Sequence, residues 1–148
     1  MNLNTAQWLA ESLMKDHGLD GWTFTWDRAT RRAGVCRYST RTISLSRPIA
    51  ELNDEDEVRD TILHEIAHAL VGSIHKHDYV WQAKARAIGC SGNRTTSAAA
   101  PEGRWVAICP NHGQIGSRFQ KPSLRLIHGT CKRCKSEITW LDKQYATV

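Results

Sequence analysis

The sequence predicts an α+β fold in which helices pack on a small antiparallel sheet and a smaller β module follows. Three patterns support this prediction. Apolar and polar residues alternate from Trp22 to Trp26, a helical repeat runs from Asp54 to Val71, and four Cys or His residues form two close pairs after residue 104. We therefore expect a first domain over residues 1–90, a linker over residues 91–103 and the β module over residues 104–148.

The N-terminal part should form one helix and three strands. Residues Thr5 to His17 have an amphipathic helical pattern that ends before a glycine. The segments Trp22–Trp26, Val35–Tyr38 and Thr42–Ser46 are typical of short, half-buried strands. We expect these strands to form an antiparallel meander.

The central helix should run from about Asp54 to Val71. Asp54 and Glu57 fit a capping box, acidic residues fill the first turn, and Gly72 marks the end. A further helix is expected over residues 78–88, with Trp81 among its inward residues. Apolar side chains four residues apart should form the core stripe of the central helix: Val58, Ile62, Ile66 and Leu70.

The central helix contains the most informative motif of the chain, His64-Glu65-Ile66-Ala67-His68. Two histidines four residues apart lie on one helical face, so their imidazoles can hold one zinc ion. Glu65 lies beside that face and can act as a general base. On this composition an H-E-x-x-H pattern arises by chance in about one or two chains in a hundred. The motif predicts a catalytic zinc site.

A catalytic zinc site needs a third protein ligand and one open position. The metzincin pattern would place the third histidine at position 74, which is Ile74, and no methionine follows the helix. The remaining candidates are His75 and His77. We favour His77, because it begins the next helix and can face the first.

A second metal site is predicted in the β module. Cys109 and His112 form one knuckle, and Cys131 and Cys134 form another. Four such ligands close a tetrahedral zinc site and give it a structural role. A redox-active C-x-x-C pair or unrelated cysteines would leave the first knuckle unexplained, and His128 is a rival ligand with less regular spacing. We therefore expect two zinc ions per chain.

Composition and charge suggest where the protein acts and on what. No apolar run approaches membrane-spanning length and no secretory segment begins the chain, so we expect an intracellular protein, cytoplasmic or nucleoid-associated. The net charge is +5, and acid-free basic segments lie at residues 28–47 and 103–135. Such segments favour a polyanionic partner, with single-stranded or non-specifically bound DNA first. The predicted DNA-binding residues are Arg118, Lys121 and Arg125.

Several segments together resemble the SprT-like (Spartan-type) zinc metallopeptidases. They are Gly21–Phe24, Gly34–Tyr38, Ile43–Ser46 and the histidine motif, followed by His77 with an aromatic residue, as His77-Asp78-Tyr79-Val80-Trp81. The resemblance implies a minimal zincin-type peptidase domain with a C-terminal zinc ribbon. It also implies proteolysis of proteins bound or crosslinked to DNA. The chain departs from the family at Asp78, where glycine is usual.

Two other functions remain open at this stage. The chain could be a DNA-binding zinc module that recruits partners without catalysis, but the intact Glu65 argues against this. It could also be a zinc hydrolase of a non-peptide bond, which the ribbon does not exclude. The sequence does not identify a group that stabilises the reacting oxyanion. Tyr79 is a weak candidate, with packing the favoured role.

Overall fold

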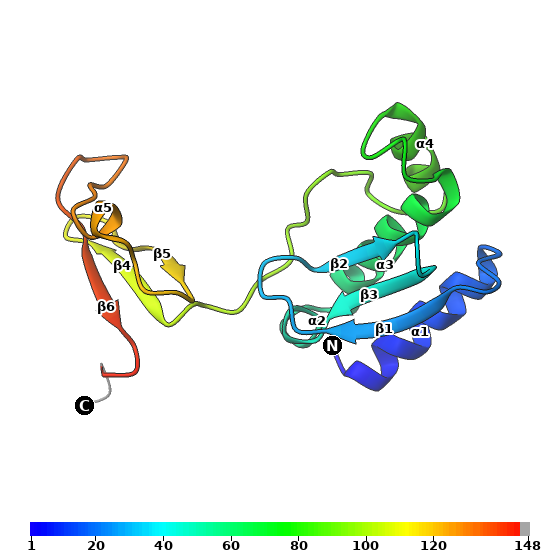
Figure 1. Cartoon of the computed structure of the whole chain (residues 1–148), viewed down its shortest axis with the longest axis horizontal. Helices are drawn as coiled ribbons and strands as arrows, with labels where there is room; N and C mark the ends of the chain where they lie inside the picture. Colours follow the sequence, from blue (N-terminus) through cyan, green and yellow to red (C-terminus); the bar gives the residue numbers. More distant parts are fainter. Residues whose placement is uncertain (146–148) are drawn as a thin grey trace. The chain divides into compact units, whose positions relative to one another are not determined.

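The computed structural model describes residues 1–145, and the chain divides into two compact units, the first Met1–Pro101 and the second beginning at Glu102. Within the described residues no helix is long and apolar enough to cross a membrane. The first unit contains a sheet and four helices (Figure 1). Its elements, in chain order, are α1 (Leu3–Asp16), β1 (Thr23–Asp27), β2 (Gly34–Arg37), β3 (Thr42–Ser46), α2 (Arg47–Leu52), α3 (Glu55–Val71) and α4 (Tyr79–Ala87).

The sheet of the first unit is mixed, so the expectation of a fully antiparallel sheet was wrong. Its strand order is β1-β3-β2, with β2 antiparallel to β3 but β1 parallel to it. The β1–β2 connection carries the chain from one edge of the sheet to the other, past the position that β3 then fills between the two strands. Asp27 fixes this connection because its carboxylate accepts hydrogen bonds from the Ala29 amide (2.9 Å), Arg32 (3.0 Å) and the Ser44 hydroxyl (2.6 Å).

The central strand β3 is buried on both faces. Ile43 and Leu45 face the hydrophobic core as expected, and Ser44 and Ser46 are buried as well. Both serine hydroxyls are satisfied, Ser44 by Asp27 and Ser46 by the Ala29 carbonyl at 2.6 Å. Because both hydroxyls are hydrogen-bonded, they avoid the free-energy cost of burying unpaired polar groups in the middle of the sheet.

Helix α3 packs on α1, β2, β3 and α4, and it begins and ends where the sequence predicts. The Asp54 carboxylate accepts from the Glu57 amide at 3.0 Å, and Gly72 closes the helix with a φ of 90°. The Glu57 carboxylate accepts a hydrogen bond from the Ser97 hydroxyl at 2.6 Å. Three residues of the predicted core stripe are buried, whereas Leu70 is 36% exposed because it lies in the last turn.

Two segments beside α3 complete the first unit. Helix α2 was not predicted, although Ser46 caps it and a proline occupies its first turn. The segment after α4 has no helix or strand, and it is hydrogen-bonded to α2 and α3. The Asp60 carboxylate accepts from the Ser91 amide (2.6 Å) and hydroxyl (2.9 Å), and the Ala99 amide donates to Asn53 (2.8 Å). These bonds hold the segment along the N-terminal half of α3.

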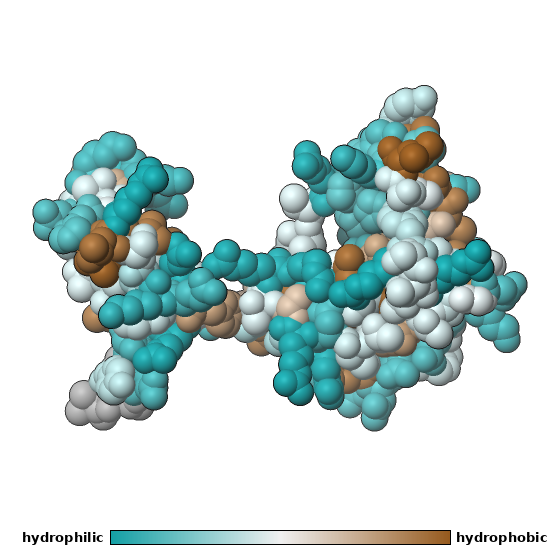
Figure 2. All heavy atoms as spheres, in the orientation of Figure 1, coloured by the Kyte–Doolittle hydropathy of each residue, from teal (hydrophilic) through white to brown (hydrophobic). Residues whose placement is uncertain are grey.

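The second unit is a three-stranded antiparallel sheet with a short helix. Its elements are β4 (Trp105–Cys109), β5 (Gly113–Arg118), α5 (Leu124–Ile127) and β6 (Thr139–Asp142), in the strand order β5-β4-β6. Among its described residues, the buried hydrophobic side chains are few: Val106, Ala107, Cys109 and Cys131. On the face drawn in Figure 2, hydrophilic residues dominate this unit and hydrophobic ones form small patches. So small a core needs additional support to stay folded.

Candidate metal centres

Three histidine side chains converge beside α3. His64 and His68 lie one turn apart on the helix, and the α3–α4 connection brings His77 to face them. The Nε2 atom of His77 lies 3.0 Å from Nε2 of His64 and 3.1 Å from Nε2 of His68. One ring nitrogen from each of the three histidines falls within a single group that could hold a metal ion.

This donor set fits a zinc ion. Ligands placed about 2.0–2.1 Å from zinc in a tetrahedron stand roughly 3.3 Å from one another, close to the observed separations. Burial lowers the pKa values of His64 and His68 to about 4, with the neighbouring histidines adding to the effect. Both imidazoles are therefore neutral near pH 7 and offer a lone pair to a metal. Three imidazoles leave the fourth position open, as a catalytic site requires.

The Trp81 indole supports all three histidines. It is 1% exposed, and its ring centroid lies 4.6 Å from that of His64, 5.2 Å from that of His68 and 4.7 Å from that of His77. Its Nε1 donates to the His64 carbonyl at 3.4 Å. Trp81 was predicted only as an inward residue of α4. Its contact with the metal site depends on how α4 packs against α3.

His75 lies outside the histidine cluster. Its Nδ1 atom lies 2.9 Å from the Asp78 carboxylate, which also caps α4 by accepting from the amides of Val80 (3.0 Å) and Trp81 (3.1 Å). Lys76, between the two candidate histidines, has a φ of 47°, so the chain reverses there. The reversal and the Asp78 contacts hold His75 away and present His77 to α3. Of the two candidates, the structure brings His77 into the cluster.

Glu65 lies under the histidine cluster and is 6% exposed. Burial raises the pKa of its carboxyl to about 8, although the charge of Arg32 and a hydrogen bond from the Cys36 backbone act in the opposite direction. Gly34 of β2 makes this position possible. A Cβ there would lie 3.0 Å from Glu65 Cγ and 3.0 Å from Leu45 Cδ2, so a larger residue would displace the glutamate. The site thus places a buried carboxyl with a raised pKa beside the metal ligands.

Two hollows flank the pair His64 and Glu65. One, of about 310 Å³, lies toward the β1–β2 connection and the segment after α4. The other, of about 410 Å³, lies toward β2 and the α3–α4 connection and is lined in part by Cys36 and Tyr38. Tyr79 lines neither hollow and is 83% exposed, so it does not reach the site in this structure. Of the two cysteines outside the ribbon cluster, Cys36 is half-buried and Cys90 is buried.

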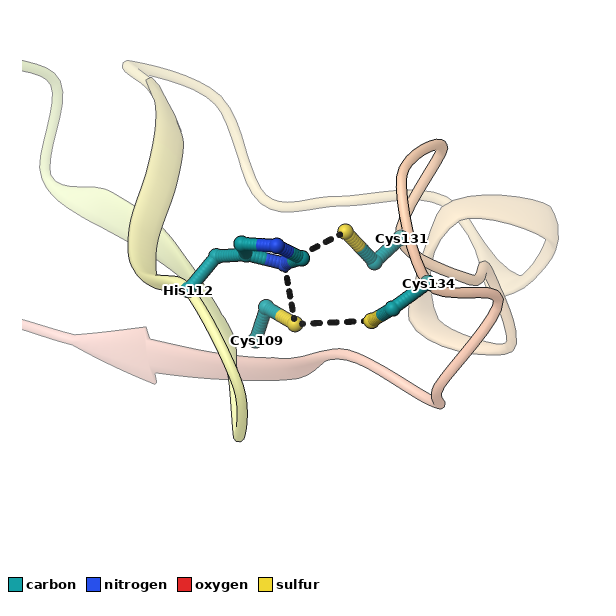
Figure 3. Close-up of side chains that lie close together, drawn as sticks. All are labelled: Cys109, His112, Cys131 and Cys134. Atoms are coloured by element: carbon teal, nitrogen blue, oxygen red, sulfur yellow. Dashed lines mark hydrogen bonds between the residues drawn. The ribbon is translucent and has the colours of Figure 1, made fainter.

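The second candidate centre is formed by the four residues predicted for the ribbon. Figure 3 shows Cys109, at the end of β4, and His112, in the β4–β5 turn, pointing toward Cys131 and Cys134 from the loop that precedes β6. The Sγ atom of Cys109 lies 3.5 Å from Cys134 Sγ and 3.5 Å from His112 Nδ1, and Cys131 Sγ lies 3.5 Å from the same nitrogen. His128 is not part of the cluster.

The Cys₃His set also fits zinc. Sulfur and nitrogen ligands around zinc stand roughly 3.5–3.8 Å apart, which agrees with the observed distances. Hydrogen bonds from Ser136 and Asn111 lower the pKa of the Cys134 thiol to about 5, so this sulfur is a thiolate near neutral pH. With four ligands the site is closed, as in structural zinc sites.

The three residues predicted to bind DNA lie in the second unit but differ in exposure. Lys121 and Arg125 are exposed, the latter on α5. Arg118 ends β5 and is half-buried, and its Nε atom is buried without a hydrogen-bond partner among the described residues. Lys121 and Arg125 are therefore better placed than Arg118 to meet a large polyanion.

Comparison with known proteins identifies one family. The model of the SprT-like family matches residues 4–100, which include the whole histidine cluster and Glu65. No curated protein and no solved structure gives a significant match.

Proposed function

Because the chain belongs to the SprT-like family, we propose that it is a zinc-dependent peptidase that cleaves proteins bound or crosslinked to DNA. The family suggests zinc peptidase chemistry, and the cluster of His64, His68 and His77 fits it. The observation that carries the proposal is the convergence of three imidazole nitrogens beside a buried glutamate.

Each residue of the site has a distinct role. The three imidazoles would hold the metal, and a zinc ion bound there would supply Lewis-acid chemistry that polarises a carbonyl and makes water more acidic. Glu65 would accept the proton of the attacking water and return it to the leaving amine. A cation bound beside it would lower the raised pKa of its carboxyl and so favour the carboxylate that this step needs. Trp81 holds the imidazoles in position from below. Gly34 leaves room for the glutamate.

The DNA part of the proposal is supported by charge. The segment from residue 103 to 135 has seven Lys or Arg residues and no acid. Zinc bound by three thiolates leaves the ribbon site with a charge of about −1, which offsets only part of this excess. Basic surfaces of this kind bind phosphates and weaken as salt rises.

The test is cleavage of a basic protein bound to DNA by the zinc-loaded full-length chain, with and without DNA. We expect cleavage to be stimulated by DNA, to be absent in Glu65→Gln, and to fall in a Lys121→Glu/Arg125→Glu variant. A matched control, Lys15→Glu/Lys84→Glu, changes two exposed lysines of the first unit and should retain the stimulation. A cleavage rate that is unchanged by DNA and by the ribbon substitutions would refute the DNA-linked role. The chain would then be a general zinc peptidase.

A further inference from the structure

The hollow on the β1–β2 side of the catalytic pair is rich in arginine. It is about 310 Å³ in volume, and His64 and Glu65 form part of its wall. Hydroxyl and amide side chains line much of the rest. The lining includes Arg31, Arg32, Asn93, Arg94, Thr95 and Thr96.

The charges around this hollow are unbalanced. Arg32 forms an ion pair with Asp27 at 3.0 Å, but Arg31 and Arg94 form no ion pair with any carboxylate in the described part of the chain. The acids that line the hollow are Glu65 and Asp60, and both oxygens of Asp60 already accept hydrogen bonds from Ser91. Two exposed arginines, Arg31 and Arg94, therefore line the hollow without a carboxylate partner among the described residues.

The position of the hollow identifies what can fill it. His64, Glu65 and Gly34 are shared with the second hollow, so the two hollows meet at the catalytic pair. A chain lying across His64 and Glu65 must place residues on both sides of its reacting bond into these two spaces. The group that meets the arginines is therefore part of the molecule being cut, close to the bond that breaks.

We infer that the hollow lined by Arg31 and Arg94 is a specificity subsite for a carboxylate of the peptide substrate. This inference rests on the proposed peptidase function and specifies the substrate of the same site. A guanidinium binds a carboxylate through two parallel hydrogen bonds, and neighbouring Thr95 and Thr96 can add hydroxyl donors. The carboxylate comes either from an Asp or Glu side chain or from the C-terminus of the substrate.

The test is a series of quenched fluorescent peptides in which Glu, Gln or Lys occupies each position around the cut bond in turn. We expect kcat/KM for Glu to exceed that for Gln by about tenfold or more at one position, since charged hydrogen bonds are about twice as strong as neutral ones. In Arg31→Gln/Arg94→Gln this ratio should fall toward one. Arg47→Gln removes an exposed arginine that lines neither hollow, and should keep the ratio.

Two further arms distinguish the sources of the ligand. Peptides that end just beyond the cut bond, with a free or amidated C-terminus, show whether the terminal carboxylate is the group bound. A single-stranded oligonucleotide is added as a competitor. If it blocks peptide cleavage in the wild type but not in Arg31→Gln/Arg94→Gln, and Glu is not preferred over Gln, the hollow binds phosphate and the inference is wrong.

A binding assay separates this inference from the proposed function. Glu65→Gln is expected to bind the Glu peptide without cutting it, and fluorescence anisotropy measures its affinity for the Glu and Gln peptides. Preference for Glu that disappears with the two arginine substitutions supports the subsite even if no peptide is cleaved. Equal affinity for the two peptides overturns it, whereas absence of cleavage by the wild type counts against the peptidase proposal alone.

Discussion

Replacing Glu65 with glutamine should stabilise the metal-free protein, and more so as the pH rises. The carboxyl is buried, and its pKa in the folded protein is about 8 compared with 4.5 for an unperturbed glutamate. Between these values the unfolded chain has lost the proton that the folded chain still holds. The unfolded state then binds fewer protons, so stability falls with increasing pH across this interval.

The size of the effect follows from the two pKa values. Each pH unit between them lowers the free energy of unfolding by about 1.4 kcal/mol, so the full interval amounts to roughly 5 kcal/mol. Glutamine has nearly the same shape and does not ionise. The wild type and Glu65→Gln should therefore have similar stabilities near pH 4.5 and diverge up to about pH 8, with the variant more stable.

The assay is urea unfolding of both proteins after removal of metal, at pH 5, 6, 7 and 8. His64 and His68 also titrate differently in the folded and unfolded states, but both proteins share these residues and their contribution cancels in the difference. Adding zinc should reduce the difference, because a cation beside the carboxylate lowers its pKa. A stability difference that stays constant from pH 5 to pH 8 would refute the reasoning that burial sets the state of Glu65.

Three more outcomes are expected. His77→Ala should lose the catalytic zinc whereas His75→Ala should retain it, as measured by metal analysis; the reverse result would exchange their roles. Trp81→Ala should destabilise the first unit by about 3–5 kcal/mol in urea unfolding and weaken zinc binding by about 10–100-fold, while an unchanged zinc affinity would limit Trp81 to packing. Cys131→Ser should abolish amide-exchange protection in the second unit and leave that of the first unit intact, whereas retained protection in the second unit would argue against a structural metal there.

Local sequence patterns predicted those parts of the structure that depend on local geometry. The spacing of His64 and His68 fixes their shared helical face, and Asp54 and Gly72 define the ends of α3. The two ribbon knuckles likewise give a metal site from spacing alone. In each case the interacting residues are only a few positions apart in the sequence, so the local backbone conformation largely determines how their side chains are placed.

The strand pairing that sequence reasoning missed depends on contacts between distant segments. The parallel pairing of β1 with β3 follows from how the β1–β2 connection is held at Asp27. The sequence did favour His77 over His75, but it did not show that the contact between His75 and Asp78 holds His75 outside the cluster. Helix α2 had a local signal, a serine cap followed by proline at Ser46-Arg47-Pro48, that could have revealed it.

The position of Trp81 also gives the protein an internal optical reporter. Its indole contacts the rings of His64, His68 and His77, so any change in the charge of those imidazoles occurs next to one fluorophore. The chain has six tryptophans, and subtracting the emission of Trp81→Phe from that of the wild type isolates this one. Protonation and metal exchange at the catalytic centre can then be followed in real time without an added label.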